Sequence, residues 1–196
     1  MRRVLISVYD KKGIVEFAKK LQKNGFELIA SKGTQKTLNE GGVDGVKAVS
    51  EYTGFAELLE GRVKTLHPKL VAAILAQKNN KKHLEQLERL GTKPIDLVVC
   101  NLYPFEEVTK QSQVSLQTAI ENIDIGGSTL IRAAAKNFEN VAVAVNPRRY
   151  NRILREYRKH GEVPAETRKT LAAEAFKVTA KHDLAVYRFL EKTSLS

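Results

Sequence analysis

The sequence predicts an α/β fold with a mostly parallel sheet, and three observations lead to this prediction. Short, uninterrupted apolar runs such as residues 4–8 are typical of strands buried on both faces of a sheet. These runs alternate with segments of helical periodicity, which is the order found in βαβ units. A chain of 196 residues with 42% hydrophobic residues, 12 glycines and 5 prolines is also able to build a packed core.

The first βαβ unit is formed by two apolar runs, residues 4–8 and 26–30, with a helix between them. Residues 14–21 carry their apolar side chains at helical spacing, and the Asn-Gly pair at 24–25 is a helix stop signal. A polar loop follows each strand, and a Gly-Gly pair at 41–42 interrupts the chain after a short helix. The two strands are therefore expected to be parallel neighbours.

Two further strands are predicted at residues 96–101 and 141–145, with helical patterns at 82–90, 116–122 and 129–137. After Pro147, a basic amphipathic helix extends to Gly161 and presents a packing face of Tyr150, Ile153, Leu154 and Tyr157. A long helix follows Pro164, and the side chains available for its packing are Leu171, Ala175, Phe176 and Val178. Because no repeat or linker interrupts the pattern, we expect one domain over residues 1–196.

Composition limits the cellular location and the partners. No segment approaches the run of about 18 apolar residues that spans a membrane, and the N-terminal apolar run is too short for a signal peptide. The single cysteine, Cys100, allows no internal disulfide or multi-cysteine zinc site, so we expect a cytoplasmic protein. A net charge of +11 predicts an anionic partner: nucleic acid, a membrane surface or a phosphorylated small molecule.

Two loops after the first strands have the composition of a phosphate site. Lys11 follows the first strand, which carries Ser7, and Ser31-Lys32-Gly33-Thr34 follows the second strand directly before a helix. Backbone N–H groups, a helix N-terminus and a lysine together attract a phosphate at this edge of a parallel sheet. The alternative is an ordinary helix cap with solvated lysines.

The segment at residues 61–69 concentrates positive charge. In extended backbone Arg62 and Lys64 project to the same side, where they are able to clamp a phosphate or stabilise charge on a reacting oxygen. The alternative is a charged surface loop. His67, next to Pro68, is predicted to be a structural hydrogen-bond donor rather than a metal ligand, since the other histidines lie far apart in the sequence.

Two more loops contribute polar side chains. Asn101 and Tyr103 follow the third predicted strand, where they are placed to orient a heteroaromatic substrate. Asp124 precedes a Gly-Gly turn at a helix start, and Lys136 comes about two turns into that helix. We interpret Asp124 and Lys136 as a proton-transfer pair. The alternative is an N-cap acid and a surface lysine.

These motifs, GRVKTLHPK at 61–69, NLYPF at 101–105, IDIGG at 123–127 and IRAAAKN at 131–137, resemble the inosine monophosphate (IMP) cyclohydrolase domain of the bifunctional purine-biosynthesis family. The resemblance covers essentially the whole chain. It implies a methylglyoxal-synthase-like three-layer α/β/α fold with a helical C-terminal layer. The implied reaction closes the ring of 5-formamidoimidazole-4-carboxamide ribotide to IMP and water, the last step of de novo purine synthesis, without metal or cofactor.

The resemblance also implies site residues and partners. The catalytic residues by this pattern are Lys64, Tyr103, Asp124 and Lys136. The substrate-binding residues are Ser7, Lys11, Ser31, Gly33, Thr34, Arg62, Thr65, Asn101 and Gly126. The implied partners are a phosphorylated nucleotide, a second copy in a homodimer, and a transformylase on a fused domain or separate protein. Tyr9, Lys32 and the pair Val71 and Ala73 depart from the family pattern, which has Ser, Gly, and His with Gly there.

Two other functions compete with the enzyme. Arg148, Arg149, Arg152, Arg155, Arg158 and Lys159 make a basic stripe at helical spacing, as in nucleic-acid-binding helices. The stripe lacks exposed aromatic side chains, because Tyr150 and Tyr157 fall on the packing face. The second competitor is a phosphate-sensing domain of the same fold without catalysis.

Overall fold

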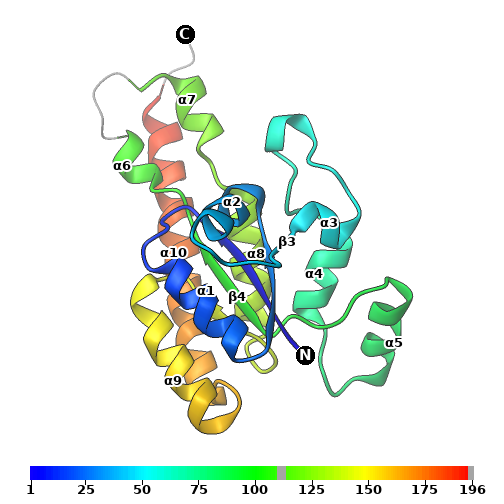
Figure 1. Ribbon diagram of the computed structural model, residues 1–196. Helices are drawn as coiled ribbons and strands as arrows, with labels where there is room; N and C mark the ends of the chain where they lie inside the picture. The colour runs from blue at the N-terminus through cyan, green and yellow to red at the C-terminus, as the bar shows by residue number, and fades with distance from the viewer. Residues whose placement is uncertain (110–113, 194–196) are drawn as a thin grey trace.

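The computed structural model describes residues 1–109 and 114–193. Its centre is a parallel sheet in the order β3-β2-β1-β4-β5 (Figure 1). The strands are β1 (Arg2–Val8), β2 (Phe26–Ala30), β3 (Lys47–Ala48), β4 (Leu97–Asn101) and β5 (Ala142–Ala144). The four predicted strands are therefore confirmed. The fifth strand, β3, was not predicted because two residues paired to the end of β2 carry no periodic signal.

Helices cover both faces of the sheet, as expected for a three-layer fold. Figure 1 shows α1 (Ile14–Lys23), α2 (Lys32–Glu40) and α9 (Tyr150–His160) in front, and α8 (Ile125–Lys136) behind. The helices α4 (Pro68–Leu75) and α10 (Ala165–Lys192) pack against α8. The remaining short elements are α3 (Val49–Thr53), η1 (Leu59–Gly61), α5 (Lys81–Arg89), α6 (Phe105–Thr109), α7 (Leu116–Glu121) and η2 (Pro147–Arg149).

The strand order reverses between β1 and β4. From β1 the chain builds outward through β2 to β3, whereas from β4 it builds in the opposite direction to β5. Right-handed crossovers in opposite directions place α1 and α8 on opposite faces of the sheet. The loops that follow the neighbouring strands β1 and β4 therefore lead to opposite faces of the sheet. Open parallel sheets bind ligands in the crevice between two such loops.

Among the differences from the sequence prediction, two helices matter for the site, while the short helices α3 and α6 were also not predicted. The helix expected from residue 129 begins at Ile125, because the Asp124 carboxylate accepts a hydrogen bond from Gly127 N (2.7 Å) and makes the Gly-Gly pair part of the first turn. Helix α4 was not predicted. It begins at Pro68, and His67 caps it by accepting from Lys69 N at Nδ1 (3.2 Å), so the imidazole is an acceptor there rather than the expected donor.

The C-terminal helices pack largely as predicted. Tyr150, Ile153, Leu154 and Tyr157 are all buried on α9, and the Tyr150 ring stacks on Phe17 of α1 with centroids 4.2 Å apart. On α10 the prediction for Phe176 was wrong: the ring is 41% exposed, with the Arg132 guanidinium over one face. None of the helices described is long and apolar enough to cross a membrane.

A buried amide joins the end of α8 to the end of α4. Asn137 donates hydrogen bonds from Nδ2 to the carbonyl oxygens of Ile74 (2.7 Å) and Ala76 (3.0 Å). Those carbonyls have reached the end of their helix and need partners from outside it. The side chain of Asn137 therefore satisfies acceptors that would otherwise be buried without a hydrogen bond.

We expect Asn137→Ala to lower the free energy of unfolding by about 2–3 kcal/mol, since two buried carbonyl groups lose their donor. Urea denaturation followed by circular dichroism measures this loss. Asn39→Ala, at an exposed position of α2, is the control and should change the stability by less than about 0.5 kcal/mol. Equal effects of the two substitutions would contradict the assigned role.

Candidate active site at the carboxyl edge of the sheet

The loops after β1 and β2 meet at a buried hydroxyl group. Thr34 Oγ1 lies 3.2 Å from both Val8 N and Ser31 Oγ, and 3.3 Å from Lys11 Nζ. The Lys11 ammonium also contacts the Val8 carbonyl. The structure thus brings together three of the predicted phosphate-binding side chains. Ser7, also predicted to bind substrate, is half-buried on β1, one residue before Val8.

The N-terminus of α2 is open toward this cluster. Ser31 is the N-cap, yet its hydroxyl makes no capping hydrogen bond and instead points to Thr34. The first-turn N–H groups therefore keep no side-chain acceptor within the described chain, which leaves them available to an anion. A methyl group built on Gly33 would meet nothing within 4 Å, so there is also room for a ligand.

Lys64 extends the positive charge of this cluster. Burial lowers the pKa of the Lys11 ammonium, the positive charge of Lys64 lowers it further, and Asp10 opposes both effects. The interaction between the two ammonium groups means that the basic segment at 61–69 reaches the loop after β1. Two lysines held near one another form a site in which a phosphate relieves their mutual repulsion.

Arg62 has a different environment from Lys64. Its guanidinium forms an ion pair with Glu121 at the end of α7, where the arginine side chain is 60% exposed. The hydrogen bonds and charge of Glu121 raise the pKa of Arg62. The structure therefore does not place Arg62 with Lys11, and an anion that used Arg62 would have to compete with a carboxylate.

The basic segment is seated on the start of α8. Thr65 is buried, and its Oγ1 lies 2.5 Å from where a Cβ atom on Gly126 would stand. A Cβ on Gly127 would meet the two carboxylate oxygens of Asp124 at 2.7 and 2.9 Å. Glycine is therefore required at both positions, because a neighbouring side chain lies where a Cβ atom would stand. Thr65, Gly126 and Asp124 thus lie next to one another at the start of α8.

The loop after β4 is fastened to the loop after β1. Asn101 Oδ1 accepts from Tyr9 N (2.7 Å) and Asp10 N (2.9 Å), and its Nδ2 donates to the Asp10 carbonyl (3.1 Å). Tyr103 packs edge-on against the Tyr9 ring with centroids 4.4 Å apart, and its hydroxyl raises the pKa of Tyr9. The side chain of Asn101, which was predicted to contact substrate, therefore connects the loops after β1 and β4, the two strands between which the strand order reverses.

Asp124 and Lys136 are not a proton-transfer pair within one chain, so this part of the prediction was wrong. Asp124 is the N-cap of α8 and Lys136 is its last residue. A rise of 1.5 Å per residue separates them by about 18 Å. Lys136 is exposed in the last turn, as in the alternative of an N-cap acid and a surface lysine. The error arose because the helix begins four residues earlier than its periodicity suggests.

Asp124 instead has neighbours on β4 and α10. The Cys100 thiol, whose pKa is raised by burial and then by the negative charge of Asp124, donates to the Gly127 carbonyl (3.8 Å). On the other side, Asp124 N donates to Nε2 of the buried His182 (3.4 Å), whose ring packs edge-on against Phe105.

Sequence reasoning missed His182 as part of this site. Its spacing of three residues from the buried Thr179 and Ala185 would have placed it on the packing face of the last helix. No group of three or more His, Cys, Asp or Glu side chains in the described residues is arranged to hold a metal ion.

Comparisons with known proteins agree with this fold. The MGS-like domain family matches residues 13–129, and the AICARFT/IMPCHase bienzyme family matches residues 134–196. A solved structure described as the crystal structure of ForH has a TM-score of 0.85 and 32% sequence identity. The match covers 95% of this chain and 97% of that chain.

Two curated relatives are each named bifunctional purine biosynthesis protein PurH. The protein from Caldicellulosiruptor bescii is 50% identical over 97% of this chain, and the one from Thermoanaerobacter sp. strain X514 is 49% identical over 96%. The chain spans 37% of the length of each relative. The chain therefore belongs to the MGS-like domain family, and its resemblance to the IMP cyclohydrolase part of the bifunctional purine-biosynthesis proteins is confirmed.

Proposed function

We propose that this chain is an IMP cyclohydrolase, which closes the pyrimidine ring of 5-formamidoimidazole-4-carboxamide ribotide and releases water. The observation that carries the proposal is the junction of four loops at the carboxyl edge. Thr34 joins the loops after β1 and β2, Asn101 joins those after β1 and β4, and Thr65 rests on Gly126 at the start of α8. A phosphate cradle and a carboxylate thus share one edge of the sheet.

The phosphate end of the substrate is held by charge and by backbone. In this proposal the 5′-phosphate lies against the open N-terminus of α2, with Lys11, Ser31, Gly33 and Thr34 around it. The anchored ribotide then brings its carboxamide and formyl groups to the Asp124 side of the edge. Holding the two reacting groups face to face removes much of the entropy cost of ring closure.

Ring closure needs a base and an electrophilic group. The carboxamide nitrogen loses one proton and bonds to the formyl carbon. The formamido nitrogen loses a second proton as its double bond to that carbon forms, and the formyl oxygen takes up two protons and leaves as water. Asp124 Oδ2 is the proposed proton acceptor, since Oδ1 is occupied by Gly127 N. Lys64 and Tyr103 are the proposed donors that stabilise charge on the formyl oxygen. Lys136 has no part in these steps within its own chain.

Two alternatives receive less support. The basic stripe of α9 is interrupted by ion pairs, because Glu174 binds Arg149 and Glu156 binds Arg152, which disfavours a strand of nucleic acid as the main partner. A sensor without catalysis would need the phosphate cradle alone. Asp124, at the start of α8, keeps one carboxylate oxygen free of hydrogen bonds in the described residues, and an available base favours the enzyme.

The partners implied by the resemblance stay proposals. Exposed apolar side chains on α10 (Phe176, Leu184, Tyr187 and Leu190) supply a surface that suits a homodimer. The greater length of the PurH relatives is consistent with a transformylase on a fused domain or a separate protein. The cytoplasmic location, and a reaction without metal or cofactor, are also carried forward as predictions.

The activity is tested by mixing the chain with the formylated ribotide and following the appearance of IMP. We expect turnover above the uncatalysed rate, and a loss of at least about 100-fold for Asp124→Asn because the base is removed. Asparagine keeps an oxygen that can cap α8, so binding of IMP should change by less than about threefold.

Asp183→Asn, at an exposed position of α10, is the matched control and should retain full activity. A parent chain that binds IMP without accelerating its formation would support the sensor instead. An active Asp124→Asn variant would exclude the role given to Asp124 while leaving the cyclohydrolase activity established.

Lys136→Met should leave the rate of IMP formation within about threefold of the parent, since about 18 Å of helix separates Lys136 from Asp124. The measurement is kcat for the monomeric chain, isolated by size-exclusion chromatography. A 100-fold loss in the monomer would contradict the arrangement of α8 described above.

The electrostatic interaction of Lys11 with Lys64 predicts a pH dependence. Because its pKa is lowered, Lys11 should lose its proton at a lower pH than a lysine of ordinary pKa, and binding of ribose 5-phosphate should weaken as the pH rises through that value. Lys64→Gln removes a neighbouring positive charge, so the titration of Lys11 should move to higher pH. The carbon-13 chemical shift of Lys11 Cε, followed against pH, reports its titration in the parent chain and in the Lys64→Gln variant. The same Lys11 pKa in both proteins would contradict the interaction.

A further inference from the structure

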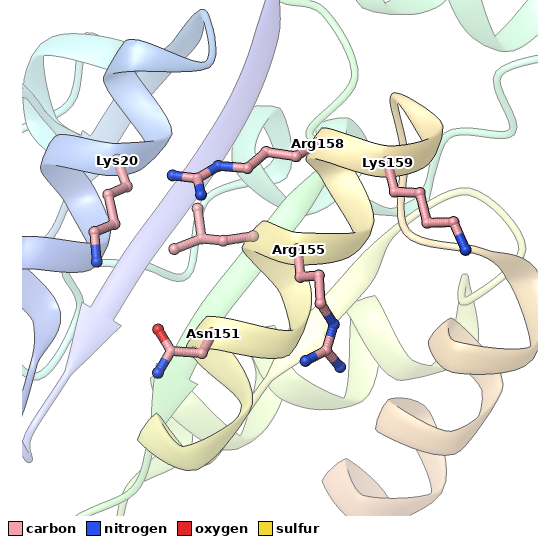
Figure 2. Close-up of a pocket in the computed structure, with 6 residues that line it drawn as sticks. Lys20, Asn151, Arg155, Arg158 and Lys159 are labelled. Carbon is pink, nitrogen blue, oxygen red and sulfur yellow. The ribbon is translucent and has the colours of Figure 1, made fainter.

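A second cationic feature lies between α1 and α9. A hollow of about 420 Å³ is lined by Lys20 of α1 and by Asn151, Leu154, Arg155, Arg158 and Lys159 of α9 (Figure 2). Figure 2 shows Arg158 reaching from α9 toward the side of Lys20, whereas Arg155 and Lys159 extend from the other side of α9, away from α1. The lining thus has four cations and no carboxylate.

The cations of this hollow differ from the other arginines of the same region. Arg149 is paired with Glu174, and Arg152 with Glu156 and the Thr167 hydroxyl. Lys20 and the three cations of α9 in the hollow, by contrast, form no ion pair within the described parts of the chain. The positive charge around the hollow is therefore left uncompensated by carboxylates of the described residues, and a bound anion would relieve the repulsion between neighbouring cations of α9.

The walls of the hollow are held in place by the core. Phe17 of α1 stacks on Tyr150 of α9 with an interplanar angle of 4°, and Leu154 is buried at the base of the lining. The separation of the two helices is therefore fixed by packing. Lys20 lies toward the C-terminal end of α1, whereas the candidate active site is at its N-terminal end, so the hollow is a separate feature.

We propose that this hollow is a second anion site that binds an oligophosphate, a chain of two or three phosphoryl groups. Guanidinium and ammonium groups suit phosphoryl oxygens, and the volume is that of a small-molecule site. The two aromatic rings of α9 nearest to it, Tyr150 and Tyr157, are only 5% and 7% exposed, so no ring is available to stack on a base.

An extended nucleic acid is a poorer fit for the same surface. A phosphodiester strand gains affinity from many charges along a continuous stripe, but ion pairs at Arg149 and Arg152 divide the stripe of α9. What is left is a single group of four cations around the hollow, which suits a short oligophosphate better than an extended strand. The ligand chain can be free or can be the phosphate tail of a nucleoside triphosphate.

The proposal is tested by isothermal titration calorimetry of the full chain with inorganic tripolyphosphate. The titration is carried out in saturating ribose 5-phosphate, which blocks the proposed phosphate site at the carboxyl edge. The heat of tripolyphosphate binding then reports the second site. We expect one tripolyphosphate per chain and at least a tenfold loss of affinity in Arg155→Gln/Arg158→Gln. The double variant Arg148→Gln/Lys177→Gln removes the same charge from exposed positions outside the hollow and should change the affinity by less than twofold.

Equal weakening in both double variants would overturn the proposal, because net charge alone would explain the binding. Retention of binding by Arg155→Gln/Arg158→Gln together with its loss in Lys11→Gln would also overturn it, by assigning the anion to the active site. A single-stranded RNA of twelve nucleotides that bound more tightly than tripolyphosphate through Arg155 and Arg158 would replace the small ligand with nucleic acid. ATP distinguishes the sources: equal affinity supports a free oligophosphate, and tighter binding supports a nucleoside triphosphate.

Discussion

The hydrogen bond from Gly127 N to the Asp124 carboxylate determines where α8 begins, and the arrangement of the carboxyl edge depends on it. The cap draws the carboxylate over the first turn, within 3 Å of where a Cβ on Gly127 would lie. It also turns the bare backbone of Gly126 toward Thr65, so that the basic segment can rest on the helix. A side chain at either glycine would separate the groups that the proposed chemistry requires to be close.

The other half of the edge is organised by electrostatics as much as by packing. Lys11 is half-buried beside Thr34, and the nearby Lys64 adds a second positive charge that makes the protonated form of Lys11 less favourable. A fold accepts such repulsion where a ligand compensates it. The N-terminus of α2, which has no side-chain cap, begins at Ser31 in the same cluster, so in the proposed binding mode backbone dipoles and side-chain charges would attract the same phosphate.

The sequence was sufficient for the sheet but not for the details of the site. The four buried strands were predictable because their apolar runs are uninterrupted, whereas β3 and α4 depend on pairing to β2 and on the cap at His67, which periodicity does not show. The loops of Lys11, Thr34 and Asn101 lie together as expected, since they follow the carboxyl ends of the neighbouring parallel strands β1, β2 and β4. The separation of Asp124 from Lys136 was missed, because it depends on a helix start set by one hydrogen bond. His182 was missed because its contact with Asp124 joins segments 58 residues apart.

The two cationic places of the molecule explain why net charge alone is a poor guide to function. At the carboxyl edge, Lys11 and Lys64 are combined with a helix N-terminus, a buried hydroxyl and a carboxylate, a set of groups that can both bind a phosphate and move a proton. Between α1 and α9 the cations have only an amide and a leucine beside them, which suffices to hold charge but offers no group for catalysis. The difference between the proposed active site and the proposed second anion site therefore lies in the neutral and acidic neighbours of their lysines and arginines, and those neighbours are determined by the fold.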